Sequence, residues 1–348
     1  MAEHPRLSSP RLVAWETTRA CNLSCRHCRA TAQTTPAAGQ LDPDQSRTLL
    51  YQLASFPEPP MVILSGGEPL MRPDITSLAK LGTDLGLRML LSTNGSLVTH
   101  SLAKDLRRAG IKRFSLSLDA PEADAHDQFR GQAGSFDAIV SAASIFKSLD
   151  LPFQINSTIT PQNILQTEEI SDLAARLGAV AHHVFLLVPV GRAKDWKEGE
   201  NLPADQYETA LIKLRKREEF LTLEFKATCA PQYQRIGRQL GLPIAKRSSR
   251  GCLGGQGFMF IGHDGVVAAC GYLPLPAGHV LNDHPVEIYK DSPLFNELRD
   301  RTRYRGRCRE CEYFNVCGGC RARAYALGDH MGPEPLCPHR PKLNEALQ

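Results

Sequence analysis

The sequence predicts an α/β fold, in which a partial barrel of six strand–helix units, (β/α)6, is followed by a smaller cysteine-rich domain. Two observations support this prediction. Apolar runs and amphipathic stretches of helical period alternate six times between residues 11 and 191, and eight of the eleven cysteines lie between Cys229 and Cys337. The chain has 348 residues, enough for one large domain and a smaller one, which we place at residues 1–215 and 216–348.

The alternating region contains short, nearly continuous apolar runs rich in β-branched residues. We expect strands at residues 12–18, 61–67, 88–94, 113–119, 153–159 and 182–191. We expect helices between them near residues 43–55, 74–85, 99–109, 135–149 and 165–177. Such strands, separated by helices, are typical of a parallel sheet covered by helices. This rhythm alone fits a doubly wound sheet as well as a barrel.

The ends of the expected strands carry polar or glycine-rich segments. Asn156 lies late in the fifth strand, and the other five strands are followed by "TTRACNLSC", "SGGEP", "STNG", "SLDA" and "PVGRA". In parallel barrels the carboxyl ends of the strands meet at one mouth, where the active site lies. Six such ends in series favour an open, TIM-like partial barrel. A purely structural turn role stays open for each loop, including Asn94 and Asp119.

The pattern changes near residue 203. A charged helix is expected at residues 203–220, and the cysteine-rich region follows it. Glycines and short β-like runs in "GFMFIGHDGVVAACGYLPL" predict a small irregular domain that metal binding holds together.

Charge and hydropathy exclude several classes of protein. The net charge of +4 is small and the basic residues are dispersed, so no nucleic-acid partner is expected. No run approaches eighteen apolar residues, and the first twelve residues lack the apolar stretch of a signal peptide, so we expect no membrane partner and a cytoplasmic location. Because that compartment keeps thiols reduced, eleven cysteines indicate metal binding rather than disulfides.

Three cysteines, Cys21, Cys25 and Cys28, lie within eight residues after the first expected strand. Structural zinc is normally held by four protein ligands, so this CxxxCxxC spacing is a poor zinc site. A [4Fe–4S] cluster takes one thiolate per iron, and three thiolates leave one iron free for another ligand. The spacing therefore predicts a cluster with one open coordination position.

Together with Gly66-Gly67-Glu68-Pro69 one unit later, this loop resembles the signature of the radical S-adenosylmethionine (SAM) enzymes. In that superfamily SAM binds the open iron, and an electron from the cluster cleaves it to a 5′-deoxyadenosyl radical. The resemblance implies SAM contacts at Gly66 and Gly67, which allow close backbone approach, and at Glu68, a carboxylate acceptor for the SAM amino group. Further contacts that it implies are Ser117, Arg130 and Leu187, with His27 near the adenine.

The C-terminal cysteines resemble the SPASM domain, an extension of radical SAM enzymes with two auxiliary [4Fe–4S] clusters. The resemblance implies two ligand sets, Cys229, Cys252, Cys270 and Cys320, and Cys308, Cys311, Cys317 and Cys337. Two residues separate Cys317 from Cys320, where three are more usual. Taken alone, the CxxC pairs also fit zinc ribbons, and Cys229 also fits a free thiol.

Longer phrases, among them "LVAWETTRACNLSCRHCRA" and "GCLGGQGFMFIGHDG", resemble the heme-biosynthesis branch of the radical SAM enzymes, and "ACGYLPL" favours its Fe-coproporphyrin III decarboxylase. This implies an iron tetrapyrrole substrate, two of whose propionates become vinyl groups to give heme b. It also implies an electron donor such as a ferredoxin or flavodoxin. Arg321, Arg323, Tyr325 and His279 are candidates for binding the acidic substrate, or else a solvated basic loop.

Other functions stay open. Related tetrapyrrole enzymes convert didecarboxysiroheme to Fe-coproporphyrin III or make heme d1, and peptide- or sulfatase-modifying SPASM enzymes would share every cysteine. A zinc-dependent nucleic-acid-binding module is a different class, against which the weak net charge argues.

Overall fold

The computed structural model describes residues 8–196, 203–242 and 251–341. Its strands form one ten-stranded sheet in the order β10-β9-β8-β1-β2-β3-β4-β5-β6-β7. Strands β1 to β7 are parallel, β8 is parallel to β1, and β8, β9 and β10 are antiparallel to one another. Their bounds are β1 Leu12–Thr18, β2 Met61–Gly66, β3 Arg88–Thr93, β4 Phe114–Ser117, β5 Phe153–Ile159, β6 Ala181–Leu186, β7 Glu224–Thr228, β8 Phe258–Ile261, β9 Val266–Cys270 and β10 Leu273–His279.

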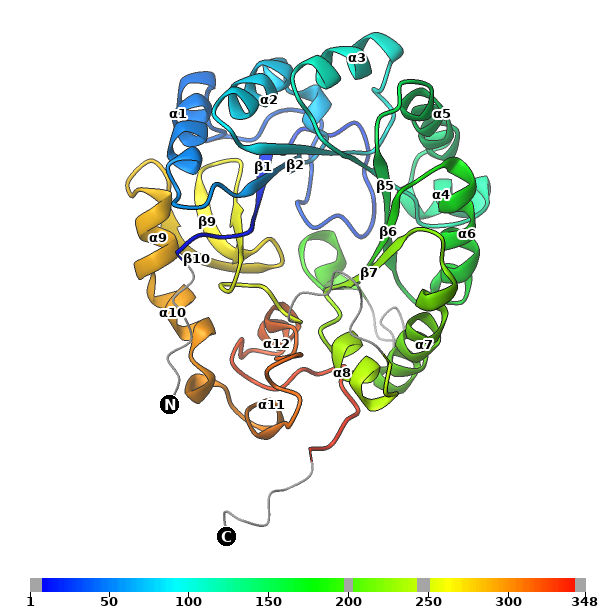
Figure 1. Ribbon diagram of the computed structural model, residues 1–348, viewed down its shortest axis with the longest axis vertical. Helices are drawn as coiled ribbons and strands as arrows, with labels where there is room; N and C mark the ends of the chain where they lie inside the picture. Colours follow the sequence, from blue (N-terminus) through cyan, green and yellow to red (C-terminus); the bar gives the residue numbers. More distant parts are fainter. Residues whose placement is uncertain (1–7, 197–202, 243–250, 342–348) are drawn as a thin grey trace.

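The helices lie on the outside of the curved sheet (Figure 1). The helices that follow the parallel strands are α1 Pro43–Ala54, α2 Ile75–Asp84, α3 His100–Arg108, α4 Ala123–Arg130, α5 Ser135–Ser148, α6 Thr167–Leu177, α7 Ala204–Arg217 and α8 Gln232–Gln239. Those of the C-terminal part are α9 Pro285–Asp291, α10 Pro293–Arg299, α11 Arg307–Glu310 and α12 Arg321–Ala326. Short 3-10 turns lie at Pro69–Met71, Ile164–Gln166, Gly191–Asp195, Glu218–Phe220 and Arg301–Arg303.

The predicted α/β architecture is confirmed, and each of the six expected strands is present within a few residues of its predicted bounds. Helix α4 was not predicted, because its eight residues between β4 and α5 are too few to show a clear helical period. The sheet also extends beyond six strands, since β7 adds to β6 and β8 adds to the far side of β1. The C-terminal residues thus share the sheet of the barrel, and the division at residues 215 and 216 stays a prediction.

The outer face of the sheet is apolar, whereas part of its inner face is polar. Side chains on the outer face pack under the helices, and Leu64, Leu116 and Ile155 are fully buried there. The alternate positions point inward. One inner row runs across four neighbouring strands at register partners and is polar and half-buried; it consists of Ser117, Asn156, His183 and Lys226.

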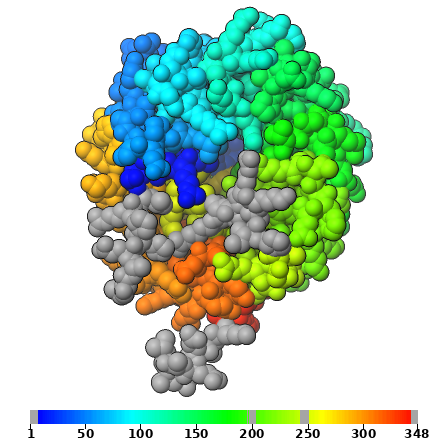
Figure 2. All heavy atoms as spheres, in the orientation of Figure 1, coloured from blue at the N-terminus to red at the C-terminus, as the bar shows by residue number. Residues whose placement is uncertain are grey.

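The cysteine-rich segment lies between the two ends of the sheet, with α11 and α12 between β10 and α8 (Figure 1). In the space-filling view its orange residues adjoin the yellow-green residues of the α7–α8 region (Figure 2). The Gln232 side chain on α8 donates to the Leu336 carbonyl at 3.4 Å. None of the helices in the described ranges is long and apolar enough to cross a membrane.

Candidate active site and metal centres

The three-cysteine loop follows β1 and is held from the far side of the barrel. Its Cys21 N–H donates to the Gln33 carbonyl at 2.7 Å. After β6, a Cβ at Gly191 would overlap the Cys28 carbonyl, and the Arg192 N–H donates to that oxygen at 3.0 Å. The Arg192 guanidinium also donates to the Cys25 carbonyl at 3.1 Å. Gly191 and Arg192 were not among the predicted site residues, although the "PVGRA" strand end was the signal that could have found them.

The thiols of the loop are close enough to interact. Cys25 is buried, whereas Cys21 and Cys28 are half-buried. Burial raises the pKa of Cys21 to about 11, although the hydrogen bond from the Leu23 N–H lowers it. The negative charges of the Cys25 and Cys28 thiolates raise it further. A bound metal reverses this preference, because it stabilises thiolates. The loop therefore presents three thiols whose ionised form needs a cation.

The predicted glycine loop packs directly on the segment that leads into the cysteines. Gly66 has a φ of +143°, and a Cβ there would overlap the Thr18 carbonyl oxygen. A Cβ at Gly67 would overlap the Ala20 carbonyl, to which the Glu68 N–H donates at 2.7 Å. Both glycines are thus required for this close backbone approach.

The Glu68 side chain is fully buried and engaged by the chain itself. It accepts hydrogen bonds from the Thr93 hydroxyl and the Asn94 N–H, both at 2.7 Å, and from the Leu70 N–H at 3.1 Å. Burial raises the pKa of Glu68 to about 7, although these three hydrogen bonds lower it. The carboxylate therefore ties the loop after β2 to the loop after β3, and its contact with SAM stays a prediction.

Arg130, on α4, reaches the same mouth. It forms an ion pair with the buried Asp119 after β4 and donates to the Cys25 sulfur at 3.8 Å. Its Nε is buried and has no hydrogen-bond partner in the described residues. Ser117 ends β4, and the half-buried Leu187 follows β6. The structure thus brings these predicted SAM contacts to the carboxyl edge of the sheet.

His27 lies beside the cysteines and packs against Phe129 of α4, with ring centroids 4.5 Å apart and the ring planes tilted by 36°. Burial holds the pKa of His27 well below its usual value, and the Arg130 charge lowers it further. The ring is therefore neutral.

The structure brings the first predicted ligand set together. Burial raises the pKa of Cys229 well above its usual value, and the thiolates of Cys320, Cys270 and Cys252 raise it further. Cys229 also has a φ of +55°, which is uncommon for a residue other than glycine and frequent at functional sites. Cys229 is far from the other cysteines in sequence, but it directly follows β7, and the fold places it near them.

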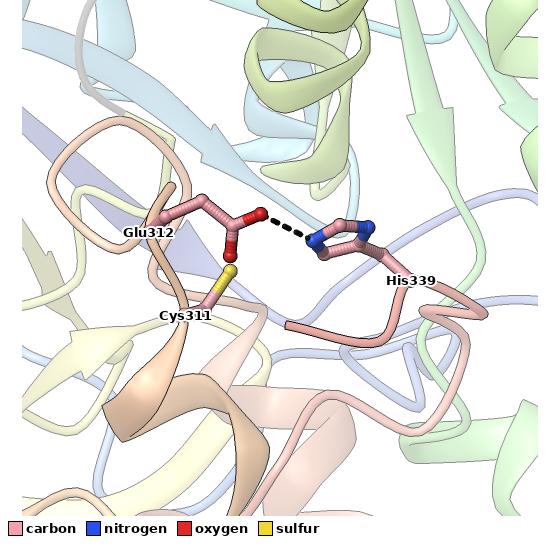
Figure 3. A group of neighbouring side chains, drawn as sticks. All are labelled: Cys311, Glu312 and His339. Atoms are coloured by element: carbon pink, nitrogen blue, oxygen red, sulfur yellow. Dashed lines mark hydrogen bonds and ion pairs between the residues drawn. The ribbon is translucent and has the colours of Figure 1, made fainter. Parts of the chain in front are cut away.

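The second predicted set lines one pocket, formed by Cys308, Cys311, Cys317 and Cys337. Beside it, the ligand atoms of Cys311, Glu312 and His339 lie within 4.8 Å of one another (Figure 3). His339 Nε2 and Glu312 Oε1 are 3.2 Å apart. Cys311 belongs to the predicted set of four thiols, so Glu312 and His339 lie at the edge of that pocket. The three sets, with three, four and four thiols, fit [4Fe–4S] clusters, one of them with an open iron.

Arg321 and Arg323 were suggested either as tetrapyrrole contacts or as a solvated basic loop. Each is only 2% exposed, so the solvated loop is wrong, and their contact with substrate stays a prediction. Arg323 donates to both oxygens of Glu334, at 2.8 and 3.0 Å, and Glu334 accepts from the Cys320 N–H at 2.6 Å. Arg321 donates to backbone carbonyls. Residue type alone could not show this burial. His279 Nδ1 likewise accepts from a backbone N–H in its own turn.

Known proteins share this architecture. Residues 15–177 match the family model of the Radical SAM superfamily, and residues 252–312 match that of SPASM, an iron–sulfur cluster-binding domain. The chain is 43% identical to the AdoMet-dependent heme synthase of Methanosarcina barkeri, covering 96% of this chain and 98% of that relative. It is 29% identical to the Fe-coproporphyrin III synthase of the same organism, covering 94% and 87%. The structure of Streptococcus suis SuiB bound to S-adenosylmethionine has the same fold, with a TM-score of 0.77 and 18% identity over 97% of this chain and 79% of that one.

A parallel partial barrel with a three-thiol loop at its mouth, joined to an iron–sulfur domain, defines a radical SAM enzyme. Within that class, the chain belongs to the family of the AdoMet-dependent heme synthases. Its cofactors are S-adenosylmethionine and iron–sulfur clusters.

Proposed function

We propose that this enzyme converts Fe-coproporphyrin III to heme b by oxidative decarboxylation of two propionates to vinyl groups. The observation that carries the proposal is the 43% identity, over nearly the whole of both chains, to a protein named heme synthase. The relative named Fe-coproporphyrin III synthase is only 29% identical. This lower identity favours decarboxylation of Fe-coproporphyrin III over its formation from didecarboxysiroheme.

In the proposed reaction Cys21, Cys25 and Cys28 hold the cluster that binds SAM, and Arg192 and Gly191 fix the shape of their loop. When bound, this cluster would supply the electron that cleaves SAM to methionine and a 5′-deoxyadenosyl radical, and this radical would take a hydrogen atom from the β-carbon of a propionate. The substrate radical then loses carbon dioxide and one electron to give the vinyl group. Two propionates react, so two SAM molecules are consumed.

The electron released from the substrate needs an acceptor near the mouth. We propose that the auxiliary cluster that Cys229, Cys252, Cys270 and Cys320 would hold accepts it. Tyr272 is near thiols of both groups: burial raises its pKa, and the charges of Cys229 and Cys28 raise it further. Arg29, next to Cys28, donates to the Gly271 carbonyl at 3.3 Å, beside Cys270. These contacts support a short path for the electron between the two cysteine sets.

The remaining elements of the proposal are an electron donor such as a ferredoxin or flavodoxin and a cytoplasmic location. We also propose that residues 1–215 carry SAM chemistry while residues 216–348 carry the auxiliary clusters.

Anaerobic reconstitution with iron and sulfide, followed by side-by-side incubation with SAM, a reductant and each candidate substrate, tests the proposal. We expect heme b from Fe-coproporphyrin III, detected by mass spectrometry, and no product from didecarboxysiroheme. The formation of Fe-coproporphyrin III from didecarboxysiroheme, or no porphyrin product at all, would contradict it. Iron without sulfide, or bound zinc alone, would contradict the cluster assignment.

A further inference from the structure

Lys226 and His183 are direct register partners on the inner face of β7 and β6. The neighbouring outer-face residues Phe225 and Val184 pack into the apolar core under the helices, so the strand alternation turns Lys226 and His183 the other way, toward the barrel interior. Both are half-buried, which leaves part of this inner surface open.

Lys226 carries a positive charge that no direct ion pair neutralises within the described part of the chain. Among residues 8–196, 203–242 and 251–341 it has no ion pair and no hydrogen bond, and the nearby Glu224 is 3.7 Å from the Arg113 guanidinium. Burial lowers the pKa of Lys226, while Glu224 and the Cys229 thiolate oppose this effect. A half-buried ammonium whose nearby carboxylate, Glu224, is paired with Arg113 is stabilised by a ligand that supplies a further negative charge.

His183 offers a hydrogen-bond donor beside this charge. Its Nδ1 lies 3.0 Å from the Gln154 amide nitrogen, which can only donate, so Nδ1 is the acceptor and the proton is on Nε2. The same amide donates to Asn156 Oδ1 at 2.8 Å, which fixes its orientation. His183 Nε2 is buried and has no hydrogen-bond partner in the described part of the chain. Burial and the Lys226 and Arg113 charges lower the pKa of His183 to about 3, so the ring is neutral.

We propose that Lys226 and His183 together bind one carboxylate of the substrate, a propionate group of the tetrapyrrole. This inference rests on the proposed function and adds to it a binding site for the substrate. The ammonium supplies the charge, and the Nε2–H supplies a directed donor, which is the combination that a buried carboxylate requires.

The bound propionate is one that the product keeps. An ion pair stabilises a carboxylate relative to neutral carbon dioxide, so Lys226 would oppose decarboxylation of the group that it holds. Cys229 of the first cysteine set lies three residues beyond Lys226, and Ser117 lies at the other end of the same inner row. A tetrapyrrole anchored here therefore extends between the expected SAM contacts and the first cysteine set, and its reacting propionates lie away from Lys226.

Substitution of Lys226 tests the site by binding rather than by turnover. The reconstituted full chain is titrated with metal-free coproporphyrin III, and binding is followed by porphyrin fluorescence and absorbance. We expect Lys226→Met to weaken binding about ten- to hundredfold, as for loss of a charge-assisted contact, and Lys226→Arg to bind within about threefold of wild type. Lys213→Met, which removes an exposed lysine from α7, is the matched control and leaves the affinity unchanged.

The outcomes distinguish failure of the Lys226–His183 site from failure of the proposed function. If wild-type protein binds coproporphyrin III and Lys226→Met binds it equally well, the site is wrong while the proposed function stands. If wild-type protein binds no coproporphyrin, the proposed function fails and the site fails with it. Should Lys226→Met not fold, Lys226→Gln and His183→Asn keep a polar side chain at each position, and wild-type affinity in both overturns the site. Deuteroporphyrin, which has only two propionates, should show the same loss with Lys226→Met if the pair holds a propionate that the product retains.

Discussion

Arg29 of the three-cysteine loop forms an ion pair with Glu16 of β1, with a distance of 2.8 Å between Nη2 and Oε2. Glu16 is 1% exposed, and His263, in the turn between β8 and β9, lies 3.1 Å from its other oxygen. This buried carboxylate thereby joins the barrel, the cysteine loop and the C-terminal part of the chain.

Substitution Glu16→Gln should lower the free energy of unfolding. His263 and Arg29 hold the pKa of Glu16 at about 2 although burial raises it. A carboxyl group with a lowered pKa stabilises the fold above its unfolded pKa near 4.5 and loses this effect as the pH falls toward 2. The shift corresponds to about 3 kcal/mol. We expect the difference in unfolding free energy between wild type and variant, measured by denaturant unfolding, to be the same at pH 8 and at pH 5.5. A difference that vanishes at pH 8 would contradict this role.

Substitution Cys229→Ser should separate SAM cleavage from product formation. Because one four-iron cluster loses a ligand, bound iron should fall by up to about four per chain. 5′-Deoxyadenosine should still form, whereas vinyl products should be lost if this set accepts the substrate electron. Cys28→Ser, at the SAM-binding loop, is the contrasting variant and should abolish both. Unchanged vinyl formation in Cys229→Ser would count against the acceptor role.

Substitution Gly67→Ala should disrupt the mouth of the barrel. The added methyl group overlaps the Ala20 carbonyl, and neither backbone segment can retreat without breaking the contacts of Glu68. We expect a loss of more than about 2 kcal/mol in unfolding free energy together with weaker SAM binding. Gly241→Ala is a matched control, because its methyl group meets nothing within 4 Å and only its φ of +65° opposes it, at about 1 kcal/mol. Calorimetry of SAM binding and chemical unfolding measure both effects, and equal losses in the two variants would be inconsistent with the steric argument.

Substitution Glu334→Gln should destabilise the C-terminal domain. It leaves the buried Arg323 guanidinium without its counter-charge, which typically costs about 3–5 kcal/mol. Replacing both partners, as Arg323→Met with Glu334→Leu, should recover much of this loss. Coproporphyrin affinity of the folded double variant should match wild type, since the pair holds Cys320 rather than substrate; a large fall in affinity would support Arg323 as a substrate contact.

Local sequence patterns were sufficient to predict the barrel strands and the cysteine loop. The run from Leu12 to Thr18 was predicted to the residue, because a buried strand between polar segments has a clear apolar signature. Helix α4 and the extension of the sheet by β7 and β8 were missed, since strand pairing between distant segments leaves no local periodicity.

By itself, the sequence determined the class of chemistry: three thiols at CxxxCxxC spacing, followed by Gly66-Gly67-Glu68-Pro69, require only neighbours along the chain. Only the tertiary structure decided which charges are available. Arg323 and Lys226 are both basic residues near cysteines. Arg323 meets Glu334 at 2.8 Å, whereas Lys226 faces the barrel interior and forms no direct ion pair among the described residues. The burial and the partners of a charged side chain depend on contacts between segments far apart in sequence, and these contacts form only when the sheet curves and brings those segments together.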